Sequence, residues 1–280
     1  MKINLARSAG FCFGVKRALK LAYQTAKARP SVVMLGDIVH NEEVVKDITA
    51  AGIKKIDRLG KGKKTTLLIR AHGASKKTIE RAHTQGYAIV DATCPMVKEI
   101  HTLAHTAERQ GYTVIIIGDK KHDEVQGIIG QLQSNALVID YLKNIPTRKL
   151  TSLTKAAVVV QSTQNMEKVL EIVDKIKKYV PDLKFFNTIC NPTRIKQKEI
   201  LTLPLENDVI LVIGSKMSAN TRRLYELARG LNRRTYWIQS KKELRKRWFK
   251  NTRSVGITAG ASTPDKITNE IVAYLKTFTL

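Results

Sequence analysis

Short apolar runs alternate with amphipathic segments along most of the chain. Each run is bounded by Gly, Asp or Ser, as β-strands commonly are, and the segments between the runs have helical periodicity. The runs predicted as strands are KINLA, SVVMLG, TLLIRA, AIVDA, TVIIIG, AAVVVQ, KFFNTI, DVILVIG, TYWIQ and SVGITA. Helix starts follow several of them, for example Asn41 before EEVVKDI and Ser75 before KKTIERA. This alternation predicts an α/β fold with mainly parallel sheets covered by helices on both faces.

Cysteine and glycine recur in this pattern at a fixed interval. A Cys follows a strand-like run and precedes a predicted helix at Cys12, Cys94 and Cys190. Twenty-four residues after each Cys, a Gly closes an apolar strand at Gly36, Gly118 and Gly214. A later strand in each unit ends in a polar turn: LLIRAHGAS, VVVQSTQN and VGITAGAST. Chance spacing is the alternative, but the simplest interpretation is three related lobes. We expect them at residues 14–94, 95–187 and 188–280, with residues 1–13 packing on the third.

Three related lobes would bring the cysteine turns together. Ligands bind outside the carboxyl ends of parallel strands, so packing around a pseudo-threefold axis would direct three thiols and six polar turns into one cavity. A helix N-terminus favours a thiolate. The residues alone leave open a zinc site, a nucleophile with spare thiols, or an iron–sulfur cluster. Zinc normally takes four ligands, often with CxxC spacing that is absent here. A cubane cluster held by three thiolates would leave one iron without a protein ligand.

The polar turns suggest an anionic ligand beside these thiols. Imidazoles, hydroxyls and an amide near helix N-termini suit a phosphate or a diphosphate. The candidate binding residues are His40, His72, His122, Ser162, Ser218, Asn220 and Ser262. Glu124 is the only acid in the set, and near an anion and a cluster it would tend to stay protonated, which makes it a candidate proton donor. The simpler interpretation is that Asn41, Ser75 and Ser218 are ordinary helix caps.

The charge of the chain is strongly positive. It has 49 Lys and Arg against 24 Asp and Glu, a net charge of +25, densest at residues 233–253, where we predict a strand and then an amphipathic basic helix. Such a surface attracts polyanions. The alternative function is therefore a basic nucleic-acid-binding protein with structural or zinc-bound cysteines, although the chain has no RNA-binding motif or basic tail. No apolar run is long enough for a signal peptide or a membrane span, and three cysteines suit a reducing compartment. We expect a cytoplasmic protein.

Several short segments together resemble one enzyme family. GFCFGVKRA, VHNEEVV, AHGAS, DATCPMV, HDEVQG, TIC, GSKMSAN and TAGASTP are similar, in order, to segments of 4-hydroxy-3-methylbut-2-enyl diphosphate reductases. The resemblance runs from residue 10 to about residue 264 and includes all three cysteines. It implies a trefoil of three α/β lobes around one central [4Fe–4S] cluster per chain. It also implies reductive dehydroxylation of (E)-4-hydroxy-3-methylbut-2-enyl diphosphate to isopentenyl and dimethylallyl diphosphate, the final step of the methylerythritol phosphate pathway.

The same resemblance implies a role for each candidate residue. Cys12, Cys94 and Cys190 would hold the cluster, and the open iron would bind the substrate's hydroxyl group. The three histidines, Ser218, Asn220 and Ser262 would hold the diphosphate, and Glu124 would relay protons. Ser162 falls where the family usually has Thr, anchored by Gln161. The charge would favour an acidic electron donor such as ferredoxin or flavodoxin. This chain departs from the family at Ala219 and Met217, in the SKMSAN loop, and at Asp123, which stands in place of a Pro and adds negative charge near the anion site.

Overall fold

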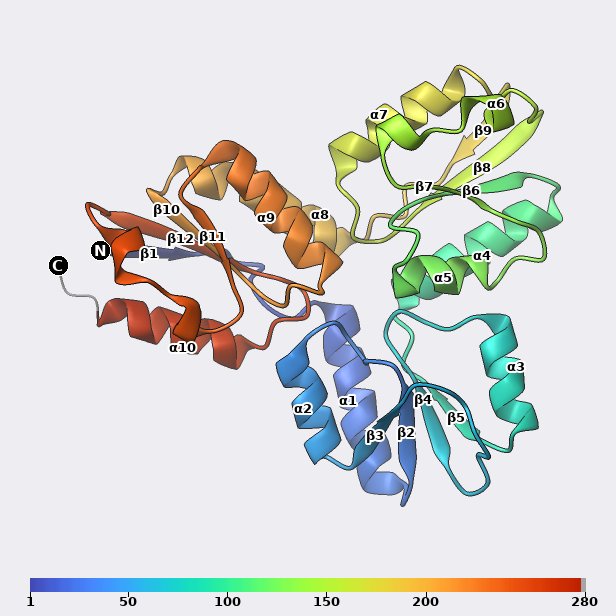
Figure 1. Cartoon of the computed structure of the whole chain (residues 1–280), viewed down its shortest axis with the longest axis horizontal. Coiled ribbons are helices and arrows are strands. Elements are labelled where there is room, and N and C mark those ends of the chain that lie inside the picture. Colours follow the sequence, from blue (N-terminus) through green and yellow to red (C-terminus); the bar gives the residue numbers. More distant parts are fainter. Residues whose placement is uncertain (278–280) are drawn as a thin grey trace. The chain divides into compact units, whose positions relative to one another are not determined.

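Three four-stranded sheets, each entirely parallel, form the framework of the computed structural model, which describes residues 1–277 (Figure 1). Helices flank every sheet, so the predicted α/β class with three parallel-sheet lobes is confirmed. We refer to the lobes by their sheets: the first has strand order β3-β2-β4-β5, the second β7-β6-β8-β9 and the third β1-β12-β10-β11. The trefoil arrangement around a cluster stays a prediction.

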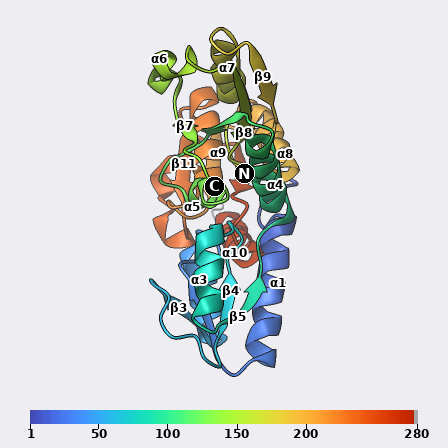
Figure 2. The same cartoon turned by 90° about the vertical axis from the view of Figure 1, so that its right-hand side faces the viewer.

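The first lobe has α-helices on both faces of its sheet. Its elements are α1 (Phe13–Ala28), β2 (Val32–Leu35), α2 (Glu42–Ala50), β3 (Ile53–Ile56), β4 (Thr66–Ile69), α3 (Lys76–Thr84) and β5 (Ala88–Asp91). In Figure 2, α1 and α3 lie on opposite sides of β4 and β5. Ser75 caps α3 as predicted, because its hydroxyl accepts from the N–H of Thr78.

The second lobe shows why its two central strands are almost continuously apolar. Its elements are α4 (Pro95–Arg109), β6 (Thr113–Ile117), α5 (Asp123–Ile129), β7 (Leu137–Ile139), a 3-10 turn (Leu142–Asn144), α6 (Thr147–Leu150), β8 (Lys155–Val160), α7 (Met166–Lys177) and β9 (Asp182–Phe185). Ile115 and Ile117 of β6 pack against α7, whereas Val114 and Ile116 pack against α4 and α5. Both faces of the sheet are therefore buried.

The third lobe takes a strand from the start of the chain. Its elements are β1 (Lys2–Leu5), α8 (Asn191–Thr202), a 3-10 turn (Leu203–Leu205), β10 (Val209–Ile213), α9 (Ala219–Leu231), β11 (Thr235–Ile238), two further 3-10 turns (Lys241–Glu243 and Lys246–Phe249), β12 (Ser254–Ala259) and α10 (Asp265–Lys276). β1 pairs with β12, with Ile3 opposite Val255. Ile271 and Leu275 of α10 pack on one face of this sheet.

Backbone contacts divide the chain into two units. Unit 1 contains Met1–Lys16, Val39–Lys46 and the chain from Asn191 onward; unit 2 contains Arg17–Ile38 and Asp47–Cys190. The sheets of the first and second lobes lie in unit 2, and the sheet of the third lobe lies in unit 1. The lobe boundaries at residues 94 and 187 stay a prediction.

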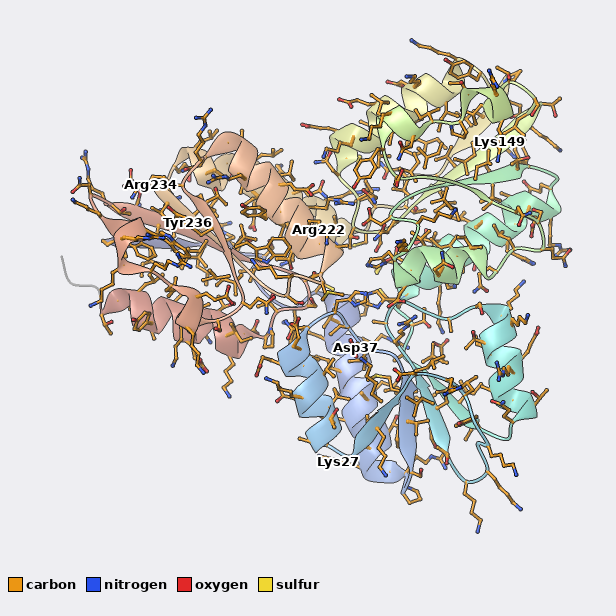
Figure 3. All side chains as sticks on the ribbon, in the orientation of Figure 1. Lys27, Asp37, Lys149, Arg222, Arg234 and Tyr236 are labelled. Carbon is orange, nitrogen blue, oxygen red and sulfur yellow. The ribbon has the colours of Figure 1, made fainter. Side chains whose placement is uncertain are left out.

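The basic segment that follows β11 is not the predicted amphipathic helix. It forms only the two 3-10 turns, because its aromatic residues pack back onto the sheet. Trp248 stacks on Tyr236 with ring centroids 4.0 Å apart, and Phe249 is buried. The Arg234 guanidinium donates to the carbonyl oxygen of Trp248 at 2.9 Å, which fixes the turn. Figure 3 labels Arg234 and Tyr236 on the ribbon of this lobe. Among residues 1–277, no helix is both long and apolar enough to cross a bilayer.

Candidate functional site

The three cysteines occupy equivalent backbone positions in the three lobes. Each lies beyond an edge strand, and its N–H donates to a carbonyl two residues past the end of the neighbouring central strand. The donor–acceptor pairs are Cys12 with Ala261 (3.1 Å), Cys94 with Ala71 (3.0 Å) and Cys190 with Ser162 (3.1 Å). The matching central strands are β12, β4 and β8. The polar turns noted in the sequence therefore hold the cysteine turns directly.

The three glycines also occupy equivalent positions. Each follows the other central strand of its lobe, and its N–H donates to the last carbonyl of the adjacent edge strand. The pairs are Gly36 with Ile56 (3.1 Å), Gly118 with Ile139 (3.0 Å) and Gly214 with Ile238 (2.9 Å). A Cβ at Gly118 would lie 2.8 Å from Val125 Cγ2 and 2.9 Å from Gln161 Cβ. A residue larger than glycine would therefore collide with Gln161, in the polar turn after β8, and with Val125, which explains why position 118 is a glycine.

The cysteine turns suit a group bound by thiolates. A helix begins immediately after each one, at Phe13, Pro95 and Asn191. Each cysteine residue is partly exposed, and within residues 1–277 none forms a disulfide. Helix N-termini stabilise negative charge, so three thiolates of this kind fit a cationic metal or cluster.

Glu124 and Ser162 form a buried pair in unit 2. Glu124 is the second residue of α5 and is only 2% exposed; Ser162 follows β8, the strand next to β6. The hydroxyl of Ser162 donates to Glu124 Oε2 at 2.8 Å, and its N–H donates to Oε1 at 2.6 Å. Burial raises the pKa of Glu124, and the two bonds from Ser162 act in the opposite direction. Glu124 and Ser162 are therefore in direct contact, and the carboxyl holds its proton more tightly than an exposed one.

Two of the candidate histidines also lie together in unit 2. The rings of His72 and His122 meet edge to face, with centroids 5.4 Å apart. His122 caps α5, because its Nδ1 accepts from the N–H of Glu124 at 3.1 Å. A neutral imidazole that accepts at Nδ1 carries its proton on Nε2. This bond therefore leaves His122 with Nε2–H as a donor.

The remaining candidates lie in unit 1. Ser218 caps α9, and its hydroxyl accepts from the N–H of Thr221 at 3.3 Å. Asn220 is 5% exposed, and its buried Nδ2 has no hydrogen-bond partner among the described residues. Ser262 donates to the backbone carbonyl of His40 at 3.2 Å, which places these two residues together. An unsatisfied buried amide is costly, so Asn220 suits a ligand that accepts hydrogen bonds.

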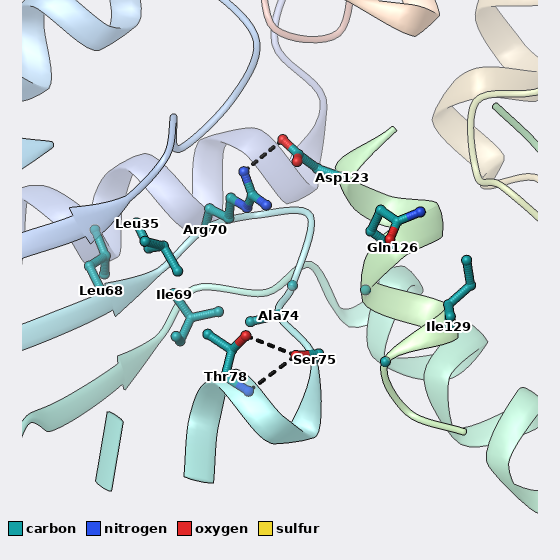
Figure 4. Close-up of a pocket in the computed structure, with 13 residues that line it drawn as sticks. Leu35, Leu68, Ile69, Arg70, Ala74, Ser75, Thr78, Asp123, Gln126 and Ile129 are labelled. Carbon is teal, nitrogen blue, oxygen red and sulfur yellow. Dashed lines mark hydrogen bonds and ion pairs between the residues drawn. The ribbon is translucent and has the colours of Figure 1, made fainter. Parts of the chain in front are cut away.

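Asp123, one of the departures from the family pattern, is paired with a cation. Its carboxylate lies 2.6 Å from Arg70 Nη1, and both side chains are partly buried. The pair lines a cavity of about 300 Å³ in unit 2, between the turn after β4 and helix α5 (Figure 4). Arg70 therefore offsets the negative charge that Asp123 adds next to His122.

Sequence reasoning missed Lys196, a buried lysine of α8 that is 2% exposed. Burial lowers its pKa to about 8, while the charges of Cys12, Glu199 and Asp265 act against that shift. The sequence carries no apolar stripe that would mark it, because the buried face of α8 consists of Thr193, Lys196, Gln197 and Ile200, three of which are polar. A lysine on such a face needs a specific partner.

Comparisons with known proteins match almost the whole chain. Residues 3–276 match the family described as LytB protein. The 4-hydroxy-3-methylbut-2-enyl diphosphate reductase of Aquifex aeolicus (strain VF5) is 39% identical over 278 residues, covering 98% of this chain and 96% of the relative. The enzyme of the same name from Geotalea uraniireducens (strain Rf4) is 37% identical over 276 residues, covering 99% of this chain and 97% of the relative.

Solved structures give the same result. A structure of (E)-4-hydroxy-3-methyl-but-2-enyl diphosphate reductase, described as the terminal enzyme of the non-mevalonate pathway, has a TM-score of 0.74 and 38% identity, covering 99% of this chain and 100% of that chain. The E-1-hydroxy-2-methyl-but-2-enyl-4-diphosphate reductase from Plasmodium falciparum has a TM-score of 0.89 and 28% identity, covering 98% of this chain and 88% of that chain.

Proposed function

This chain belongs to the LytB protein family, and from that premise we propose that it is a 4-hydroxy-3-methylbut-2-enyl diphosphate reductase. It removes the allylic hydroxyl of (E)-4-hydroxy-3-methylbut-2-enyl diphosphate and yields isopentenyl and dimethylallyl diphosphate, the final step of the methylerythritol phosphate pathway. The C–O bond breaks and a C–H bond forms, so the reaction consumes two electrons and two protons and releases water. The nucleic-acid-binding alternative has no support among the relatives, which are enzymes.

Cys12, Cys94 and Cys190 would hold one [4Fe–4S] cluster. The equivalent backbone position of the three cysteine turns is the observation that carries this proposal, because it gives three thiolates of the same environment. When bound, such a cluster supplies electrons, and its fourth iron, which lacks a protein ligand, can act as a Lewis acid. The N-termini of α1, α4 and α8 stabilise the negative charge of the thiolates.

The candidate histidine, serine and asparagine residues would hold the diphosphate. In unit 2, His122 offers its Nε2–H and His72 lies beside it. In unit 1, Asn220 offers the buried Nδ2, and Ser218, Ser262 and His40 occupy the neighbouring turns. Hydrogen bonds to an anionic oxygen are roughly twice as strong as neutral ones, so a few donors are enough to orient the substrate.

Glu124 would deliver a proton. Its burial favours the protonated form, and Ser162 fixes both carboxyl oxygens so that the group points in one direction. A carboxylic acid held neutral by burial can donate at a pH where an exposed one is ionised. Ser162 is therefore a positioning residue for Glu124.

The electrons would come from an acidic protein such as ferredoxin or flavodoxin. Residues 241–253 contain seven exposed Lys and Arg side chains and only one acidic side chain, that of Glu243. With a net charge of +25, this surface speeds association with an acidic donor and makes it dependent on salt. We place the protein in the cytoplasm, where reducing conditions keep the three thiols available.

Anaerobic purification and reconstitution test the proposal. We expect a brown protein with about four irons per chain, whose spectrum changes when the allylic diphosphate is added, and which forms both products with a chemical reductant. Cys94→Ser should fold and lose the activity. A colourless, iron-free preparation after reconstitution contradicts the proposal. In that case, a gel shift that weakens steeply with salt and is unchanged in Cys94→Ser would indicate nucleic-acid binding instead.

A further inference from the structure

The ammonium group of Lys196 is saturated by three backbone carbonyls. Its Nζ donates to Ser8, to Gly10 at 3.0 Å and to Ala259 at 3.0 Å. A lysine ammonium has three N–H donors, so each one has a partner. Two acceptors lie just before Cys12, and the third is the last residue of β12. Lys196 therefore joins the first cysteine turn to the central strand of its sheet.

A second residue of α8 holds the same segment from one turn further along the helix. Glu199 Oε2 accepts from the N–H of Ser8 at 3.1 Å and also from its hydroxyl. Lys196 thus binds the carbonyl groups of Ser8 and Gly10, and Glu199 binds the N–H and the hydroxyl group of Ser8. We call these two side chains the α8 clamp. They carry opposite charges on one helix face, and α8 begins directly after Cys190.

The first cysteine turn needs such support more than the other two. Cys12 lies seven residues after the end of β1, whereas Cys94 lies three after β5 and Cys190 five after β9. The longer connection also contains Gly10 with a φ of +93°, where a Cβ would lie 2.4 Å from Asp265 Oδ1. A longer segment loses more conformational entropy when it is ordered, so extra contacts are needed to fix it.

We propose that the α8 clamp, Lys196 with Glu199, is a positioning device that orders the Ser8–Cys12 segment and presents Cys12 in a fixed geometry before any metal binds. The role of Cys12 as a cluster ligand rests on the proposed function, but the ordering of the segment does not. Neither residue touches the substrate in this role.

The metal-free protein tests the clamp. Lys196→Met keeps the length of the side chain and removes the three donors; Lys198→Met, an exposed change two residues later on the same helix, is the matched control. In hydrogen-exchange mass spectrometry, we expect peptides covering residues 8–13 to exchange at least ten times faster in Lys196→Met, with β6 and β8 unchanged. Alkylation of Cys12 should accelerate relative to Cys94. Lys198→Met should match the wild type in both measurements.

Glu199→Ala provides a second variant if Lys196→Met fails to fold. It removes only the acceptor for Ser8, and we expect faster exchange confined to the same peptides. Unchanged exchange and alkylation in a folded Lys196→Met or Glu199→Ala protein overturns the proposal. Iron analysis separates the two hypotheses: a wild type that binds no iron, with exchange that responds to both variants, refutes the proposed function and supports the clamp. If the wild type binds iron but neither variant changes the hydrogen exchange, the result supports the proposed function and refutes the clamp.

Discussion

Removing the hydroxyl of Ser162 should change the titration of Glu124 by a predictable amount. In Ser162→Ala, the 2.8 Å bond to Glu124 Oε2 is lost, while the backbone N–H still donates to Oε1. A hydrogen bond to a charged group contributes about 1.5–3 kcal/mol. Since Ser162 stabilises the ionised carboxylate, its loss should disfavour ionisation by about 1.5–3 kcal/mol and so raise the pKa of Glu124 further.

The pH dependence of turnover measures this shift. If protonated Glu124 delivers a proton, kcat falls as the pH rises through its pKa, and in Ser162→Ala that fall should move to a higher pH. Ser162→Thr keeps the hydroxyl and is the matched control, and we expect its fall to stay at the wild-type pH. The reasoning is refuted if Ser162→Ala and wild type lose activity at the same pH while Glu124→Gln is inactive, because Ser162 then does not control this acid.

Three other changes test separate parts of the structure. Glu124 binds its proton more tightly in the folded than in the unfolded state, so its contribution to stability is full below its ordinary pKa of 4.5 and is lost as the pH rises through the folded pKa. The melting temperature of the metal-free Glu124→Gln protein should therefore rise relative to that of wild type as the pH increases. A difference in melting temperature that stays constant with pH in calorimetry contradicts this. Asp123→Pro removes the ion pair with Arg70 but places Pro at the first position of α5, where it is tolerated. The free energy of unfolding measured in urea should therefore change by less than about 1 kcal/mol. A loss of several kcal/mol would show that the ion pair is essential to the lobe. Gly214→Ala should lower the free energy of unfolding by about 1–3 kcal/mol, because its Cβ would lie 2.6 Å from a threonine hydroxyl. Gly230→Ala, whose Cβ would have no atom within 4 Å, should instead raise it by about 0.5–1 kcal/mol. Equal effects of the two variants in urea unfolding would contradict the argument from crowding.

The strands that the sequence pattern missed lie at sheet edges. β3 reads IKKI, and its two lysines are exposed; β7 has only three residues. Both are edge strands of their sheets. An edge strand buries less of its surface, so apolar residues are not required at each position and the pattern weakens. The central strands β6 and β8 are covered on both faces, and their continuous apolar runs were therefore predicted.

Site residues were predictable where a side-chain type signals the chemistry. Glu124 and Ser162 follow β6 and β8, and because these strands are neighbours in a parallel sheet, residues beyond their carboxyl ends lie together. Lys196 could not be found in this way. Its partners are backbone carbonyls, which any residue type supplies, and the nearest in sequence is 63 residues away. Only folding identifies such acceptors.

The third lobe repeats the connectivity of the other two except for one missing link. In the first lobe, β4 leads through α3 to β5, the strand before Cys94; in the second, β8 leads through α7 to β9. In the third, β12 leads to α10, and the strand beside it is β1. The equivalent step would run from α10 into β1, but these elements lie at opposite ends of the chain. The connecting loops in the other lobes have three and four residues, at 85–87 and 178–181.

A circular permutant tests whether that link is structurally equivalent. We join Lys276 to Lys2 through a four-residue loop and open the chain between Arg29 and Pro30, in the exposed turn from α1 to β2. Every strand and helix is kept, and only a surface turn is cut, so we expect the metal-free permutant to unfold in urea within about 2 kcal/mol of wild type. A permutant opened inside β12 breaks a central strand and should not fold. If the first permutant also fails to fold, then β1 depends on its free end, and the three lobes are not equivalent in the way that their hydrogen bonds indicate.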